Sequence, residues 1–250
     1  MSPVGEASST EPPDGDLPLA VRQRLHSQAL FALPVIAIVP VVIAVVLATT
    51  LAPARAAAAA LGAAGWLAAM ALRVPAGAFI ASRMPKQAAP TLTFPAWISG
   101  PAEELIRLLL VLFGVHGFGS LLWAGFGWGT VEVVSTLVTA VGVRRLLLDP
   151  SAKAAEARRG LVSMGWLQYV QSLVPVLGAV ERAAVSLLQI GFTLLLGWNP
   201  WLVLVTMPAH SALNLRAVQL IKRRSVLLME TIVMVVGAAA FALGLLAWHR

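Results

Sequence analysis

Residues 95–115 read PAWISGPAEELIRLLLVLFGV, a stretch in which apolar residues surround Glu103, Glu104 and Arg107. A run of about 20 predominantly apolar residues is long enough to cross a bilayer as a helix. An ionisable side chain inside such a span costs at least about 2.5–3.5 kcal/mol on insertion scales, so it usually persists only in a polar bundle interior where it has a function. The stretch therefore predicts a membrane helix that supplies charged groups to a buried site.

The chain as a whole has a membrane composition. It is 59% hydrophobic and 12% charged, whereas globular proteins average about 45–50% and 25%. We predict an all-α fold, a polytopic transmembrane helix bundle of about seven spans, over residues 28–250. Residues 1–27, rich in Ser, Pro and acidic residues, are expected to form a disordered cytoplasmic tail. The expected spans are 31–51, 56–80, 95–115, 118–143, 174–198, 201–221 and 226–248.

The basic residues predict the orientation of the bundle. The connections expected outside the membrane carry only Arg55, whereas a basic loop expected at 144–159 and the other inner segments carry nearly all the rest. By the positive-inside rule the N-terminus is cytoplasmic, and we expect an integral, multi-pass protein of a bacterial plasma membrane. The net charge of +7 then lies beside anionic lipid, with no soluble domain left to bind nucleic acid. The absence of cysteine excludes disulfides and thiolate sites.

Polar residues are embedded in three more of the expected spans. At 1.5 Å per residue along a helix, they fall at similar depths between the midplane and the cytoplasmic side. We therefore expect one polar intramembrane cavity, with its motif-bearing core at about residues 95–220. The glycines of the sequence GFGWG, at 125–129, would allow another backbone or a substrate to approach closely. The embedded residues are Glu132, Glu181, Arg182, Gln189, His210 and Asn214.

The two adjacent carboxylates are expected to differ in their surroundings. Neighbouring positions on a helix project about 100° apart, so one of Glu103 and Glu104 should pair with Arg107 while the other faces the cavity. Glu230 is expected near the inner boundary, in contact with lipid headgroups. A carboxylate in a pocket of low dielectric can act as a general base towards water, and His and Asn can donate hydrogen bonds to a developing oxyanion. These are the parts that peptide hydrolysis needs.

Four short motifs, in order on separate expected spans, resemble those of a known family. Residues 99–107, SGPAEELIR, resemble the EE-x-x-R motif of the YhfC family of intramembrane proteases, and 125–132, GFGWGTVE, are similar to its Gly-rich motif ending in Glu. Glu181-Arg182 resembles its ER motif. His210-x-x-x-Asn214 resembles a motif shared with the PrsW-like, CAAX-processing and bacteriocin-processing proteases.

The resemblance implies a glutamate-dependent intramembrane endopeptidase that acts on a membrane protein or peptide. Glu103 or Glu104 would activate water and Arg107 would hold the carboxylate pair. His210 with Asn214 would bind the oxyanion. Glu132 would stand where relatives carry His or Glu, with Glu181, Arg182 and Gln189 in supporting positions.

Two positions depart from the family pattern. Trp128 and Gln189 stand where relatives often carry His, which leaves His210 as the one deeply placed imidazole. A zinc site built mainly from His is therefore disfavoured, although one from His and carboxylates stays open, and we expect no cofactor. Two other functions remain as alternatives. One is a proton-coupled transporter that uses the same groups as a relay, and the other is a non-catalytic scaffold descended from a protease. The polar residues can also be read as an ion-pair network that fixes helix register.

Overall fold

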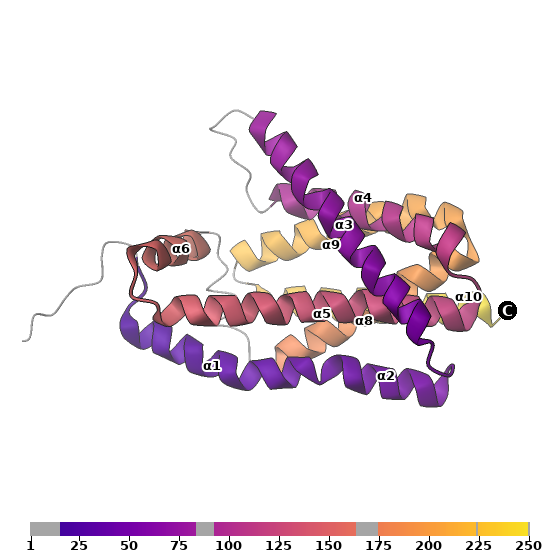
Figure 1. The fold of residues 1–250 in the computed structure, drawn as a ribbon, viewed down its shortest axis with the longest axis horizontal. Helices are drawn as coiled ribbons and strands as arrows, with labels where there is room; N and C mark the ends of the chain where they lie inside the picture. The colour runs from indigo at the N-terminus through magenta and orange to yellow at the C-terminus, as the bar shows by residue number, and fades with distance from the viewer. Residues whose placement is uncertain (1–15, 84–92, 164–174, 224, 250) are drawn as a thin grey trace, which may run out of the picture.

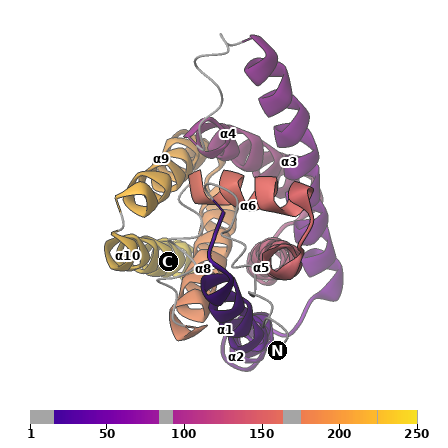
Figure 2. The same cartoon turned by 90° about the vertical axis from the view of Figure 1, so that its left-hand side faces the viewer.

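The computed structural model describes residues 16–83, 93–163, 175–223 and 225–249. These residues form helices joined by short connections, with no strand among them. The main helices pack side by side (Figure 1), and α8 lies in the middle of the bundle when the molecule is seen from one end (Figure 2). In chain order the helices are α1 (Leu19–Ala37), α2 (Val39–Thr50), α3 (Ala56–Arg83), α4 (Thr93–Leu109), α5 (Phe118–Leu148), α6 (Ala152–Ser163), α8 (Pro175–Trp198), α9 (Val203–Lys222) and α10 (Val226–Trp248).

Four helical segments are long and apolar enough to cross a membrane. They are Leu19–Thr50, Ala56–Phe79, Val176–Trp198 and Val226–Trp248, and they agree with the first, second, fifth and seventh expected spans. The other three expected spans fall on α4, α5 and α9, which are the helices that carry most of the embedded polar residues. Their glycines and polar side chains lower the hydropathy, and α4 has only 17 residues. All-helical architecture is confirmed, and the number of seven spans stays a prediction.

The N-terminal region is helical further upstream than expected. Residues 19–27, predicted to belong to the disordered tail, form the beginning of α1. The reason is a tertiary contact, because Leu25 is 1% exposed and packs against Leu147 near the end of α5. The helix is interrupted at Ile38, which lies between Pro34 in α1 and Pro40 at the start of α2. Proline lacks the amide hydrogen that a continuous helix needs at that point.

The prediction of a basic loop at residues 144–159 is also wrong, because most of these residues are helical. Helix α5 continues to Leu148 and α6 begins at Ala152, because Ala, Arg, Lys and Glu are strong helix formers whatever their charge. Arg158 closes the corner by donating to both carboxylate oxygens of Asp16, at 2.8 and 2.6 Å, and to backbone carbonyls of the α5–α6 turn. This hydrogen bonding holds the pKa of Asp16 below its usual range and raises the pKa of Arg158.

Glycines set how closely the polar helices approach one another. A Cβ atom at Gly127 would lie 1.9 Å from the carbonyl oxygen of Ala59 in α3, and one at Gly125 would lie 2.6 Å from the Cα atom of Ile190 in α8. The backbone of α5 is therefore in contact with α3 on one face and with α8 on another, as expected for the Gly-rich motif. Gly100 brings α4 equally close to α9, since a Cβ there would lie 2.2 Å from Oγ of Ser211.

Candidate functional site

The buried ion pair of α4 joins Glu104 to Arg107. The two side chains are 0% exposed, and Nε of Arg107 donates to Oε1 of Glu104 at 3.3 Å. Glu103, the residue that precedes Glu104, instead lines a pocket between the helices. The expected division between the two carboxylates is therefore confirmed, and the structure assigns the members: Glu104 pairs with Arg107 and Glu103 faces the pocket.

Arg107 fixes α4 to α8. Its Nη1 donates to the backbone oxygen of Gln189 at 3.1 Å and to Oγ1 of Thr193 at 2.8 Å, and its Nη2 donates to the side-chain oxygen of Gln189. The guanidinium plane lies over the ring of Trp128, with its carbon 4.2 Å from the ring centroid. Such a cation–π contact is strongest where water is excluded. Arg107 is thus held by α8 and Trp128 and is not among the residues that line the pocket.

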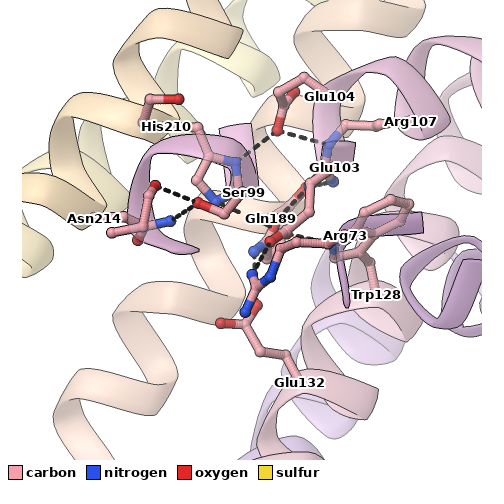
Figure 3. A network of polar contacts seen from close by, with 12 residues as sticks. Arg73, Ser99, Glu103, Glu104, Arg107, Trp128, Glu132, Gln189, His210 and Asn214 are labelled. Carbon is pink, nitrogen blue, oxygen red and sulfur yellow. Dashed lines mark hydrogen bonds and ion pairs between the residues drawn. The ribbon is translucent and has the colours of Figure 1, made fainter. Parts of the chain in front are cut away.

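His210 lies between the two carboxylates (Figure 3). Its Nδ1 is 2.9 Å from Oε1 of Glu104, and its Nε2 is 3.8 Å from Oε2 of Glu103. Phe192 meets the ring edge-on with centroids 6.0 Å apart, which limits rotation of the imidazole. A ring that donates to Glu104 through Nδ1 has its orientation fixed, and its Nε2 is then directed to the space beside Glu103.

Glu103 has two further partners that the sequence did not predict. Nη1 of Arg73, from α3, lies 3.3 Å from Oε1 of Glu103, and Nε1 of Trp128 donates to Oε2 at 3.4 Å. Helix α3 continues through Pro75 to Arg83 and so carries Arg73 beside the pocket. The available signal was an arginine within an apolar run, which implies a buried acidic partner.

Gln189 connects Arg107 to the second pocket carboxylate, Glu132. Its amide nitrogen donates to Oε2 of Glu132 at 2.7 Å, while its amide oxygen accepts from Arg107. Nη1 of Arg182 lies 4.0 Å from Oε1 of Glu132, and Arg182 also pairs with Glu181. Gln189 therefore makes hydrogen bonds at both ends of its amide.

Asn214 stands apart from the carboxylates. Its Nδ2 donates to Oγ of Ser99 at 2.6 Å, one helical turn beyond His210, and no hydrogen bond joins it to a glutamate among the described contacts. Asn214 shares the pocket with His210, however. The pocket has a volume of about 660 Å³, and the predicted site residues that line it are Glu103, Glu132, Glu181, Arg182, His210 and Asn214. Glu104, Arg107 and Gln189 lie behind its wall.

Glu230, expected near lipid headgroups, is buried inside the bundle. The residue is 2% exposed, and neither of its carboxylate oxygens has a hydrogen-bond partner among the described residues. The cause is the close crossing of α10 and α8, where a Cβ at Gly237 would lie 2.3 Å from the carbonyl oxygen of Ala184. That crossing turns this face of α10 inward.

Each carboxylate and the imidazole of the cluster has a cationic or hydrogen-bonding partner, although Oε2 of Glu104 itself is buried without one among the described residues. Arginines stand beside both Glu103 and Glu104, and Nδ1 of His210 is bonded to Glu104. Within the described part of the chain, no group of three His, Asp or Glu side chains is placed to hold a metal ion. Positive guanidinium groups at these positions fit a bound zinc ion poorly.

Comparisons with known proteins give no match. No family model matches the chain, and neither a curated protein nor a solved structure is similar to it.

Proposed function

We propose that this chain is a glutamate-dependent intramembrane protease similar to the YhfC family. It would hydrolyse a peptide bond within or beside the bilayer, in a bundle of about seven spans whose N-terminus is cytoplasmic. The observation that carries the proposal is His210 held between two carboxylates, Glu104 behind it and Glu103 in the pocket. This grouping supplies a base for water, a fixed imidazole and an open volume where a substrate can lie.

Glu103 is the water-activating group in this mechanism. A water beside Oε2 of Glu103 and Nε2 of His210 gives a proton to the carboxylate while its oxygen bonds to the carbonyl carbon of the substrate. The carbonyl electron pair moves to oxygen, and N–H donors on the pocket wall stabilise that oxyanion. The protonated ring of His210 supplies one of them from Nε2 while its Nδ1–H stays with Glu104, and Asn214 supplies the amide hydrogen that Ser99 does not accept. When the C–N bond breaks, the proton held by Glu103 passes to the leaving amine, and the carboxylate is regenerated.

The remaining cluster holds these groups in place. Arg107 and Glu104 orient His210 from behind, in the way that a carboxylate orients the imidazole of a serine protease. Gln189 ties Glu132, the second pocket carboxylate, to the same arginine. Trp128 donates its ring N–H to Glu103. The two residues that depart from the family pattern therefore contact the proposed machinery, which favours an active enzyme over a scaffold that has lost its site.

The experiment compares cleavage of a panel of membrane peptides by purified wild-type protein and by Glu103→Gln and His210→Ala. A matched control is Glu156→Gln, because Glu156 is an exposed carboxylate on α6. We expect cleavage by the wild type and the control, and loss of at least about 100-fold in the two site variants, the usual contribution of a general base. Equal cleavage by all four proteins, or cleavage by none, would refute the proposal. Addition of a chelator tests the metal question separately, and unchanged cleavage is expected.

One observation favours a second function. Glu230 is a buried carboxylate without a hydrogen-bond partner among the described residues, and such groups in membrane helices mark proton relays. A proton-coupled transporter would show proton-linked flux in liposomes that is lost in Glu230→Gln. The protease predicts that Glu230→Gln retains peptide cleavage.

A further inference from the structure

The pocket extends well beyond the carboxylates, along one face of α5. Its lining begins at Glu132 and continues through residues spaced three or four apart to Arg144. The two positions are twelve residues apart in number, which corresponds to about 18 Å along a helix axis. Helix α1 lies beside α5 (Figure 1) and lines the same length of pocket from Ile36 to Gln28. The pocket is therefore elongated, with the carboxylates at one end and Arg144 at the other.

Arg144 is not simply a topology determinant at a membrane surface. Its Nε is buried and has no hydrogen-bond partner, and the same holds for the side-chain oxygen of Gln28, which also lines the pocket. No Asp or Glu pairs with Arg144 in the part of the chain that the structure describes. A buried guanidinium N–H without an acceptor is costly, so an acceptor from outside the chain would be bound favourably there.

His26 holds this guanidinium in position. Nδ1 of His26 lies 3.2 Å from the backbone oxygen of Arg144, and Nε2 lies 3.3 Å from its Nη2. A neutral ring that donates from Nδ1 and accepts at Nε2 satisfies both contacts. The imidazole then orients the arginine without neutralising it, and the positive charge remains available to a ligand in the pocket.

We propose that Arg144 binds an acidic side chain of the peptide substrate, five or six residues from the bond that is cleaved. The spacing follows from the length of the pocket, because an extended chain advances about 3.3 Å per residue and about 18 Å separates Arg144 from the turn of Glu132, which marks the end of the pocket where Glu103 and His210 lie close to Glu132. The inference rests on the proposed protease function and names the kind of substrate that the enzyme selects: a membrane segment with Asp or Glu at this distance.

The wall between the two ends suits a peptide better than a lipid acyl chain. Ser135, Thr136 and Thr139 line it, and the threonine hydroxyls donate to their own helix carbonyls, at 3.0 and 2.9 Å. Thr136 also accepts from Nη1 of Arg182 at 3.3 Å, whereas Thr139 keeps lone pairs that can accept a hydrogen bond. An extended peptide has backbone N–H groups to offer this wall, whereas an acyl chain has none.

The test measures binding before cleavage. Labelled membrane peptides that are identical except for a single Glu or Gln are titrated onto the Glu103→Gln protein in phosphatidylcholine nanodiscs. Further variants add Arg144→Gln or, as the matched control, Arg145→Gln, which removes the same charge from an exposed neighbour. We expect Arg144→Gln to weaken binding of the Glu peptide roughly tenfold, as for the loss of one hydrogen bond to a charged group, and to leave the Gln peptide unchanged. Arg144→Glu should reverse the preference towards a Lys peptide.

Several outcomes overturn the inference. Equal weakening of the Glu and Gln peptides by Arg144→Gln, or the same effect from Arg145→Gln, would show that no acidic side chain is recognised. Wild-type cleavage that does not depend on the position of Glu along the peptide would also show that no acidic side chain is recognised. The proposed protease function would then still stand. A Glu preference that depends on Arg144 without any cleavage keeps the recognition site and removes the protease.

An anionic lipid is the other occupant with the right chemistry. Phosphatidylglycerol is added to the nanodiscs and the midpoint of thermal unfolding is measured. If the lipid stabilises the wild type and Arg145→Gln but not Arg144→Gln, while the peptides show no Glu preference, the pocket end binds a headgroup and the inference fails. We expect equal stabilisation of all three proteins.

Discussion

Replacing Arg107 by Met tests whether the cluster behind the pocket is dry and tightly paired. The substitution removes the hydrogen bonds to Glu104, Gln189 and Thr193 and leaves the Glu104 carboxylate, which is 0% exposed, with His210 as its one remaining hydrogen-bond partner among the described residues. Breaking a buried ion pair from one side typically costs about 3–5 kcal/mol, because the partner charge stays buried. For a chain of this size that corresponds to a fall of roughly 6–20 °C in the unfolding midpoint.

The assay is thermal unfolding in detergent, followed by circular dichroism, for three variants. The double variant Glu104→Gln/Arg107→Met should be more stable than Arg107→Met alone by at least about 2 kcal/mol, since no uncompensated charge remains buried. Arg145→Met, at an exposed position, should change stability by less than about 0.5 kcal/mol. A loss below about 1 kcal/mol in Arg107→Met would place the pair in the range of solvated surface ion pairs and refute the reasoning.

Three further predictions concern packing, pH and the site. Gly127→Ala should cost about 1–3 kcal/mol by overpacking against a backbone carbonyl of α3, whereas Gly142→Ala, which meets nothing within 4 Å, should stabilise the helix by up to about 1 kcal/mol; thermal unfolding distinguishes them. The ion pair between Asp16 and Arg158 stabilises the fold at neutral pH, because Arg158 lowers the pKa of Asp16. This stabilisation is lost as the pH falls below 3.8, the ordinary pKa of an Asp side chain. Spin labels on α1 and α6 should separate in that range, and at every pH in Asp16→Asn; a constant separation in the wild type contradicts this. Trp128→Phe, which removes one N–H donor from the pocket carboxylate, should slow peptide cleavage roughly tenfold and lower the unfolding midpoint, because the smaller ring leaves a cavity where a 0% exposed indole packs; an unchanged rate in the folded variant would exclude the donor role.

The sequence predicted best what depends on local apolarity. The helix expected at 226–248 begins and ends at those residues, because only Glu230 and Thr231 interrupt its apolar run. The start of α1 was missed because a distant contact between Leu25 and Leu147 decides it. The region 144–159 was misread because its positive charges suggested a loop, whereas its residue types favour a helix.

The candidate site shows the same limit. Glu103, Glu104 and His210 were predictable, since each is an ionisable residue in an apolar segment. Their partners were not, because the contact of Arg73 with Glu103 and that of Gln189 with Glu132 bridge 30 and 57 positions in the sequence. No local pattern contains such a contact. Such contacts form because glycines permit close helix crossings, which bring side chains from different helices within hydrogen-bonding distance.

The proposed division of labour between Glu103 and Glu104 follows from helix geometry. Identical neighbours on a helix project about 100° apart, so only one of them can face the pocket. Glu104 is held by an arginine and a histidine, and a carboxylate bound in this way is stabilised as an anion that fixes His210. Glu103 lies on the pocket side, with partners at 3.3 Å or more, and can exchange a proton with a bound water. The adjacent pair thus separates the orienting carboxylate from the reactive one within a single turn of α4.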